Sequence, residues 1–256
     1  MRAAIIIPAR FASTRLPGKP LLDKTGKPLV QHTYEQAVRS KADKVIIATD
    51  DERIATAARA FGADVALTDE KHESGTMRVA EAARGLDADI IVNLQGDEPD
   101  VDPDHLDMVI AAQKTSGAFA STLACPFPSN AVSGPGSPED PSAVKAILSA
   151  PEESNGLRDA LFFSRDLAAW PKTPNGAIAH PSHFFLHIGV YAFSTESLQR
   201  FTVTPPGILE RSARLEQLRI LEAGERIAVS LVDSAAPGID TPDDYADFVA
   251  RHAAKK

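Results

Sequence analysis

Residues 3–20 read Ala-Ala-Ile-Ile-Ile-Pro-Ala-Arg-Phe-Ala-Ser-Thr-Arg-Leu-Pro-Gly-Lys-Pro, an apolar run followed by a loop with three cationic side chains. The apolar run predicts a strand buried on both faces, as in parallel sheets, and Pro8 is expected to end its ladder. Ligands of doubly wound sheets bind beyond the carboxyl ends of the strands, so Arg10, Arg15 and Lys19 would face a polyphosphate there. A solvated surface position is the alternative for any one of these cations, but three of them after a buried strand favour an anion site.

The loop does not match the common phosphate-binding motifs. It lacks both G-x-x-x-x-G-K-[ST] and G-x-G-x-x-G, so backbone amides alone do not account for phosphate binding. Side-chain cations therefore carry much of the charge, which points to a nucleotidyltransferase.

Strand and helix patterns alternate along the amino-terminal half. Apolar runs predict a second buried strand over 44–49 and further strands over 64–67 and 90–94, and periodic segments predict helices over 28–40 and 52–61. Repeated βα units require a mainly parallel sheet with right-handed crossovers, so the sequence indicates an α/β fold.

The carboxyl half is expected to contain a long loop over 126–141, several strands and one amphipathic helix. The strands are predicted over 118–126, 144–148, 161–165, 184–193 and 227–232, and the helix over 215–221. Arg165 ends one of these strands and suits a carboxylate, with a surface ion pair as the alternative. His187 and Tyr191 share one face of another strand, where a histidine is usually an ordinary wall residue.

An acidic pair follows the strand predicted over 90–94, in the sequence Gln-Gly-Asp-Glu-Pro. Carboxylate oxygens at this place suit Mg²⁺ beside a triphosphate, and Asp97 is the better ligand candidate. Turn formation before Pro99 is the alternative, and the role of Glu98 stays open.

A short polar loop over 72–78 precedes another helix. Ser74 and Arg78 at a helix start favour an anion or the polar edge of a base, although a serine there often only caps the helix. Near the end of the chain, Thr241 and Pro242 predict a further helix start, for which Asp240 is not required.

Composition narrows the class of protein. A chain of 256 residues with 43% hydrophobic content is expected to form one domain, and a net charge of −8 opposes a nucleic-acid partner. The single cysteine, Cys125, excludes an intrachain disulfide and favours a reducing compartment. Neither a leader pattern nor an apolar segment of ~18 residues is present, so we expect a cytoplasmic protein without membrane insertion.

Seven segments together resemble the 3-deoxy-manno-octulosonate (Kdo) cytidylyltransferases, a family of sugar nucleotidyltransferases. They are Pro8 to Pro20, the H-x-S-G-T-x-R segment over 72–78, Gln95 to Pro99, Phe163-Ser164-Arg165, the H-x-G-x-Y segment over 187–191, Leu215 to Arg219, and Ile239 to Asp243. The resemblance extends from Ile5 to about Phe248, with a divergent region near 126–160.

The resemblance implies a three-layer α/β nucleotide-diphospho-sugar transferase fold, Rossmann-like and GT-A-like, with a mixed, mainly parallel central sheet. It also implies one cytidylyltransferase domain over 1–256. The nucleotide-binding half would cover about 1–125, and the elements for sugar binding and dimerisation about 142–235.

The resemblance implies the following residue roles. Catalysis would involve Arg10, Arg15, Lys19 and Asp97. Nucleotide contacts would come from Ala9, Arg10, Ser13, Thr14, Lys19, Ser74, Gly75 and Arg78. The sugar acid would contact Gln95, Arg165, His187, Tyr191, Glu216 and Gln217, and Asp97 and Asp240 would hold Mg²⁺, or Mn²⁺ in its place.

The implied reaction transfers CMP from CTP to the anomeric hydroxyl of Kdo, giving CMP-Kdo and pyrophosphate for lipopolysaccharide synthesis. The implied assembly is a homodimer. Two positions depart from the family pattern: many relatives have an acid at Met77, and relatives often have glutamate at Ala213, upstream in the expected helix. The second departure bears on the sugar, because a missing acceptor can reshape hydroxyl recognition.

Three other functions stay open. The nearest is a cytidylyltransferase for another 2-keto sugar acid, such as 8-amino-Kdo or a sialic-acid-like substrate. The second is a uridylyl- or guanylyltransferase that acts on a sugar phosphate. The third is a nucleotide-sensing module without catalysis, against which Lys19, Asp97 and Asp240 argue.

Overall fold

The computed structural model describes residues 1–12, 15–128, 136–167, 170–174 and 178–254. Contacts divide the chain into two compact units. Unit 1 comprises residues 1–110 and 236–256, and unit 2 comprises residues 111–235. The division falls within helix α4 (Pro103–Ser116), which the sequence patterns did not predict. A single catalytic domain that uses both units stays a prediction.

Unit 1 contains four parallel strands. They are β1 (Ala3–Ala9), β2 (Lys44–Thr49), β3 (Asp64–Leu67) and β4 (Ile90–Asn93), in the order β3-β2-β1-β4. Ile5 pairs with Val45 of β2 on one side and with Val92 of β4 on the other, so β1 lies in the interior of this sheet. All seven residues of β1 are buried, which confirms the strand predicted from its apolar run.

Pro8 does not end β1, contrary to the sequence-based expectation. The strand continues to Ala9, and Pro8 lies opposite Ala48 of β2. The pairing between β1 and β4 stops at Ile6, so Pro8 lies where β1 has lost one neighbour and a missing N–H is tolerated.

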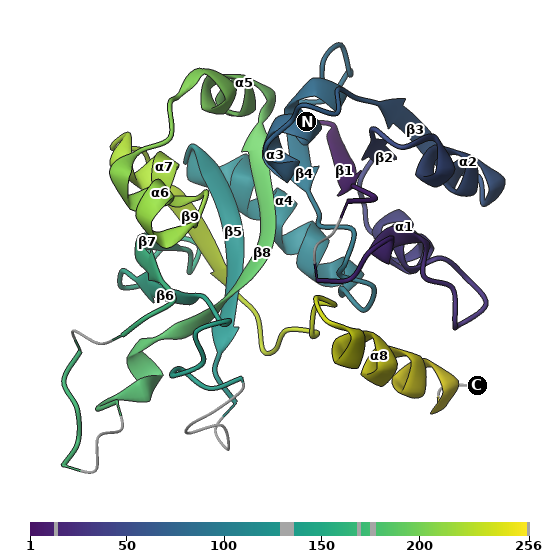
Figure 1. Ribbon diagram of the computed structural model, residues 1–256. Helices are drawn as coiled ribbons and strands as arrows, with labels where there is room; N and C mark the ends of the chain where they lie inside the picture. Colours follow the sequence, from purple (N-terminus) through teal and green to yellow (C-terminus); the bar gives the residue numbers. More distant parts are fainter. Residues whose placement is uncertain (13–14, 129–135, 168–169, 175–177, 255–256) are drawn as a thin grey trace. The chain divides into compact units, whose positions relative to one another are not determined.

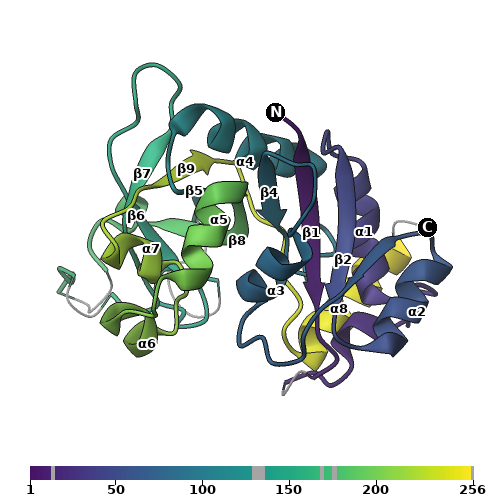
Figure 2. The same cartoon turned by 90° about the horizontal axis from the view of Figure 1, so that it is seen from above.

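Helices connect the strands of unit 1 by βα crossovers. They are α1 (Leu29–Val38), α2 (Glu52–Ala60) and α3 (Gly75–Ala82), with a short 3-10 helix η1 (Lys19–Leu21) after β1. Right-handed crossovers put α1 and α2 on one face of the sheet and α3, which returns across two strands, on the other (Figures 1 and 2). Asp51 caps α2 by accepting from the N–H of Arg53.

The carboxyl-terminal segment returns to unit 1 as α8 (Pro242–Ala254), which lies beside α1 in Figure 1. A buried cluster joins it to the amino-terminal residues Leu16 and Leu29 through Ile239, Tyr245 and Phe248. This cluster fixes the segment that carries Asp240.

A reciprocal capping arrangement begins α8. Asp244 donates its N–H to Thr241 Oγ1 at 3.2 Å, and its carboxylate accepts from the N–H groups of Thr241 and Asp240 at 2.8 and 3.0 Å. The predicted helix start at Thr241 and Pro242 is confirmed.

Unit 2 contains five strands whose pairings form a closed circuit. They are β5 (Ala120–Pro126), β6 (Lys145–Leu148), β7 (Arg158–Ser164), β8 (Phe185–Ser194) and β9 (Ile227–Leu231). Their order is β8-β5-β9-β7-β6, and β6 also pairs with β8. Only the β5–β9 pair is parallel among these pairings, so the two units together confirm the predicted mixed α/β architecture.

The helices of unit 2 are α5 (Thr195–Val203), α6 (Ile208–Ala213) and α7 (Leu218–Glu222), with a 3-10 helix η2 (Pro181–His183). The helix predicted over 215–221 was placed too early. Arg214 has a left-handed conformation, with φ of 54°, which ends α6 before α7 begins. Ala213 therefore belongs to α6, whereas Glu216 and Gln217 lie in the turn before α7. Within the ranges described above, no helix is long and apolar enough to cross a membrane.

Candidate active site

The loop after β1 is closed by its own backbone. The N–H of Gly18 donates to the carbonyl of Phe11 at 3.2 Å, and Gly18 has a φ of 66°, which favours glycine. Lys19 follows directly as the first residue of η1. A guanidinium from α2, that of Arg53, lies 3.4 Å from the centre of the Phe11 ring. The loop thus presents Lys19 from a defined turn.

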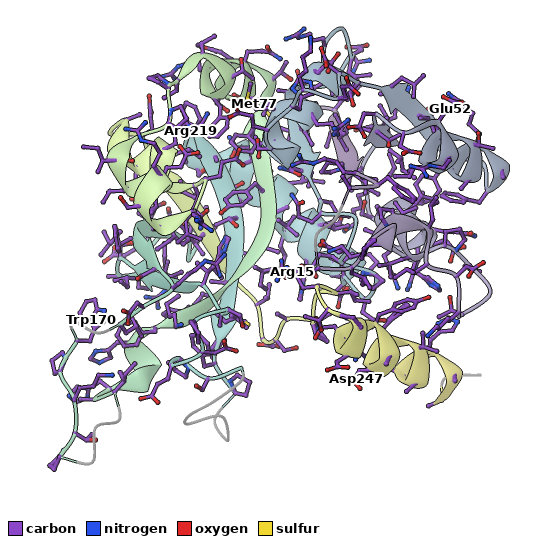
Figure 3. All side chains as sticks on the ribbon, in the orientation of Figure 1. Arg15, Glu52, Met77, Trp170, Arg219 and Asp247 are labelled. Carbon is purple, nitrogen blue, oxygen red and sulfur yellow. The ribbon has the colours of Figure 1, made fainter. Side chains whose placement is uncertain are left out.

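Lys19 lies among oxygen atoms at the centre of the candidate site. Its Nζ is 2.5 Å from Oδ2 of Asp97, 2.8 Å from the carbonyl of Ile239 and 3.4 Å from Oδ1 of Asp240. Only 14% of the Lys19 side chain is exposed. Arg15 reaches the same Asp240 oxygen at 2.9 Å (Figure 3). The structure therefore brings together four of the residues that the sequence selected.

A backbone hydrogen bond joins the segment of Asp97 to the segment of Asp240. The N–H of Ile239 donates to the carbonyl of Asp97 at 3.0 Å. The carbonyl of Ile239 accepts from Lys19, so one residue binds both the acidic loop after β4 and the lysine. Two carboxylates from distant parts of the sequence thereby converge.

A third carboxyl group, that of Glu98, is buried beside these charges. Burial, together with the negative charges of Asp97 and Asp240, raises the pKa of Glu98 to about 8. A Cβ atom added at Gly238 would lie 2.9 Å from a Glu98 carboxyl oxygen, so this carboxyl group packs closely against the backbone of Gly238. Glu98, which the sequence left open, is thus an integral part of the cluster.

The cluster meets the chemical requirement for a magnesium ion that is shared with a nucleotide. Mg²⁺ is commonly held by one or two protein carboxylates plus substrate phosphates, and Asp97 and Asp240 provide two. Among the described residues, no group of three or more His, Cys, Asp or Glu side chains forms a metal site on its own. Phosphate oxygens would have to complete the coordination.

Arg10 fastens the loop that precedes α3. Its two terminal nitrogens donate to the carbonyls of His72 and Glu73, each at 3.2 Å. Ser74 then caps α3 by accepting from the N–H of Met77 at 3.2 Å (Figure 3 labels Met77). The capping role of Ser74 is confirmed, whereas its contact with a nucleotide stays a prediction.

Gly75 and Gln95 lie against each other beside this helix start. A Cβ at Gly75 would be 3.5 Å from the amide atoms of Gln95. Gln95 donates to Asn93 at 3.0 Å, and Asn93 donates to Thr76 at 3.0 Å. This chain of amides fixes Gln95 in unit 1; its predicted contact with a sugar acid stays a prediction.

Arg78 is fully buried and already paired. Its guanidinium donates to a carboxylate oxygen of Asp50 at 2.7 Å and to the hydroxyl of Thr68. These contacts join α3 to the ends of β2 and β3. A direct contact between Arg78 and a phosphate stays a prediction.

Two nucleotide contacts predicted in the first loop, Ser13 and Thr14, lie outside the described residues. Ala9, the last residue of β1, is 2% exposed and pairs with Thr49. A contact between Ala9 and the nucleotide stays a prediction.

In unit 2, His187 and Tyr191 come together on one face of β8. Their ring centres are 5.4 Å apart, and the ring of Phe163 from β7 approaches His187 at 5.0 Å, edge to face. Burial and the neighbouring Arg165 lower the pKa of His187 to about 3, so the imidazole is neutral at physiological pH. Burial and Glu216 raise the pKa of Tyr191.

Arg165 follows β7 and lines a cavity of about 560 Å³ together with Lys172, Asp166 and other residues of unit 2. Its guanidinium donates to the carbonyl of Ser142 at 2.9 Å. The buried ammonium of Lys145 donates to the carbonyls of Ala143 and Arg165 at 2.9 and 2.8 Å. Lys145, which no sequence pattern indicated, therefore ties the 140–143 segment to the backbone of Arg165.

The turn with Glu216 and Gln217 is held by contacts between α6 and α7. Arg219 of α7 makes two hydrogen bonds with Glu210 of α6, at 2.6 and 2.7 Å, and both side chains are largely buried (Figure 3). In return, Glu222 of α7 accepts from the N–H of Glu210 at 3.2 Å near the start of α6. Two reciprocal carboxylate contacts thus fix the turn between these helices.

Comparisons with known proteins show the family of the chain. A family model described as "Cytidylyltransferase" matches residues 4–227. The 3-deoxy-manno-octulosonate cytidylyltransferase of Chloroherpeton thalassium (strain ATCC 35110 / GB-78) is 42% identical over 257 residues, which cover 100% of this chain and 99% of that protein. The enzyme of the same description from Escherichia coli is 38% identical over 242 residues, covering 94% and 92%.

Solved structures extend the comparison. A structure of CMP:2-keto-3-deoxy-manno-octonic acid synthetase complexed with CTP has a TM-score of 0.87 at 35% identity and covers 100% of both chains. A cytidylyltransferase from Leptospira borgpetersenii serovar Hardjo-bovis (strain JB197) has a TM-score of 0.61 at 18% identity, which shows a shared fold. It covers 98% of this chain and 86% of that one. The predicted fold class is confirmed, and the chain belongs to the family of 3-deoxy-manno-octulosonate cytidylyltransferases.

Proposed function

We propose that this chain transfers CMP from CTP to the anomeric hydroxyl of Kdo, releasing pyrophosphate and forming CMP-Kdo for lipopolysaccharide synthesis. The observation that carries the proposal is the convergence of Lys19, Asp97 and Asp240. A buried ammonium beside two carboxylates is suited to a reaction in which a triphosphate and a cation meet.

Positioning and neutralisation of charge dominate phosphoryl-transfer chemistry, so the cationic residues have distinct tasks. Lys19 and Arg15 neutralise negative charge as the bond to the departing pyrophosphate breaks. Arg10 donates to the carbonyls of residues 72 and 73, and in this way it would hold the start of α3 beside the phosphates.

Asp97 and Asp240 would hold Mg²⁺, with Mn²⁺ as a substitute. When bound there, such a cation would supply charge neutralisation at the phosphates and lower the pKa of a coordinated hydroxyl. The two carboxylates already lie beside a positive charge, that of Lys19, which supports this assignment.

Apart from that of Gln95, the sugar-acid contacts are assigned to unit 2. Arg165 and Lys172 line one cavity, to which Asp166 and Glu139 also contribute, and the guanidinium of Arg165 suits the carboxylate of a 2-keto sugar acid. Neutral and anionic groups for the sugar hydroxyls would come from His187, Tyr191, Glu216 and Gln217. Ala213, where relatives often have glutamate, is the last residue of α6 and lies shortly before Glu216 in the chain. Because this departure bears on hydroxyl recognition, the choice of sugar acid is tested separately.

The test is the release of pyrophosphate from each of the four nucleoside triphosphates with Mg²⁺, in the presence of Kdo, 8-amino-Kdo or N-acetylneuraminate. Release with CTP and Kdo alone is expected. Release with CTP and another acid would show a different sugar pocket, and release with UTP or GTP and a sugar phosphate would contradict the cytidylyl assignment. No release under any condition would favour a nucleotide-sensing module.

The chain is further proposed to act in the cytoplasm, as a homodimer. The free, buried thiol of Cys125 agrees with a reducing compartment. Val203 and Ile208 of unit 2 are 81% and 71% exposed, and such apolar side chains near each other in the chain support a subunit contact. Light scattering should give the mass of two chains, and Ile208→Asp should shift it toward one; a wild-type mass of one chain would contradict the homodimer.

A further inference from the structure

The hydroxyl of Thr122 on β5 lies at an irregularity in the pairing between β5 and β8. Thr122 pairs with Tyr191, but the next residue of β5, Leu123, pairs with Ile188. Two residues of β8 are therefore bypassed, and the ladder is interrupted at this point. Thr122 Oγ1 lies 2.7 Å from the carbonyl oxygen of Val190 and 3.1 Å from that of Ile188.

The same hydroxyl lies 3.0 Å from Nε2 of His187. A threonine hydroxyl has one proton and two lone pairs, and a carbonyl can only accept. The proton of Thr122 therefore points to a β8 carbonyl, and the oxygen is left to accept from His187. His187 must then carry its proton on Nε2, and its Nδ1 keeps a free lone pair.

The ring of His187 is held from two further sides, by Phe163 and Tyr191. In the described part of the chain, the buried hydroxyl of Tyr191 has no hydrogen-bond partner. The ring nitrogen of His187 that contacts Thr122 is Nε2, which leaves Nδ1 for another partner. Burial keeps the imidazole neutral, with a pKa of about 3, so Nδ1 remains an acceptor at physiological pH. An acceptor and a donor on one strand face match a hydroxyl group, which both donates and accepts.

We propose that Thr122 is a positioning residue that fixes His187 as the Nε2–H tautomer, so that Nδ1 accepts a hydrogen bond from a hydroxyl of the sugar acid. Thr122 itself does not contact the sugar. The contact with the sugar rests on the proposed function, whereas the tautomer does not.

The first experiment is nitrogen NMR of the full-length wild-type protein, with His187→Phe used to assign the signal. We expect Nε2 of His187 to have the shift of a protonated ring nitrogen and Nδ1 that of an unprotonated one. The opposite tautomer, or a charged ring at neutral pH, would overturn the proposal. This measurement needs no variant of Thr122 and no turnover.

The second experiment compares Thr122→Val, which removes the acceptor, with Thr122→Ser, which keeps it. The valine variant should lose the single tautomer and raise KM for Kdo about 3- to 10-fold, the effect of one neutral hydrogen bond, while KM for CTP stays unchanged. The serine variant should restore both. Thr202→Val is the matched control, because the hydroxyl of Thr202 donates only to a helix carbonyl, that of Gln199. An unchanged tautomer and KM in Thr122→Val would overturn the proposal.

The third experiment separates this inference from the proposed function. Kdo is added to the wild-type protein without CTP, and the Nδ1 signal of His187 is followed. A shift of that signal supports the contact even if no nucleotide is turned over. With the Nε2–H tautomer present but no shift at saturating Kdo, the sugar contact is refuted.

Discussion

The ammonium of Lys19 lies 2.5 Å from a carboxylate oxygen of Asp97, at a point where the carbonyl of Ile239 also accepts from it. Lys19 follows β1 and Asp97 follows β4, and these two strands are neighbours in the sheet. Ile239 comes from the last segment of the chain. An ion pair with only 14% of the lysine and 27% of the aspartate side chain exposed is shielded from water. Loss of either partner should therefore have a large effect.

Asp97→Asn should lower kcat by about 100-fold or more, because the amide removes one of the two proposed metal ligands and leaves Lys19 without its closest counter-charge. Binding of CTP alone should remain within a few-fold of wild type, since the cations of the first loop are intact. Pyrophosphate release and calorimetric CTP binding check the two effects. Asp104→Asn, at an exposed position in α4, is the control that should leave both unchanged; wild-type turnover in Asp97→Asn would refute the catalytic assignment.

Glu98→Gln should change how stability depends on pH. The folded pKa of Glu98, about 8, lies above its ordinary value of 4.5, so the folded state keeps a proton that the unfolded state releases as pH rises. The resulting stabilisation is fully present below pH 4.5 and is lost as pH rises to about 8, by up to about 1.4 kcal/mol per pH unit.

Glutamine carries no such proton, so the unfolding free energy of the wild type should fall relative to that of Glu98→Gln across this interval. Urea unfolding in the presence of a chelator, at a series of pH values, measures the difference. Parallel curves for the two proteins would show that Glu98 titrates normally.

Asp50→Ala should destabilise the protein by about 3–5 kcal/mol, because it leaves the buried guanidinium of Arg78 without its counter-charge. The neighbouring Asp51→Ala is a matched control, because it removes mainly a helix cap and should cost about 1 kcal/mol. Chemical denaturation distinguishes the two variants. If Asp50→Ala instead kept wild-type stability and raised only KM for CTP, Arg78 would act chiefly at the nucleotide.

Gly207→Ala should be destabilising because the new methyl group would lie 2.0 Å from a carboxylate oxygen of Glu222. Because this oxygen is the end of an exposed, flexible side chain, the carboxylate can turn away, and the loss should be at most about 1 kcal/mol, that of its hydrogen bond with the N–H of Glu210. The loss should shrink in a Glu222→Ala background, since the clashing group is then gone. Thermal unfolding of both single variants and the double variant measures the coupling, and additive effects would contradict a direct clash. Gly189→Ala meets no atom within 4 Å and serves as the control.

The sequence predicted the strands well because each is a short apolar run with a clear end. β2 and β3 have the predicted bounds, and β1 and β4 differ from prediction by at most two residues at one end. It also selected Lys19, Asp97 and Asp240, since each belongs to a recognisable motif at a strand or helix end. These signals are local, and the fold then brings them together.

Features that depend on distant partners were not predicted. Buried Arg78 pairs with Asp50, which lies in another loop, so no local pattern around Arg78 indicates this contact. The break between α6 and α7 depends on a left-handed Arg214, and an arginine gives no local signal for that conformation. Thr122 and Lys145 are ordinary strand residues by pattern, and only the pairing of their strands reveals what their polar atoms contact.

Unit 1 is built from two stretches of sequence with the whole of unit 2 between them. During translation, Lys19 and Asp97 leave the ribosome long before Ile239 and Asp240 are synthesised. A chain interrupted at any earlier codon therefore lacks both the second carboxylate and the carbonyl that hold Lys19. The order of the chain therefore makes assembly of the charge cluster a late event in biosynthesis.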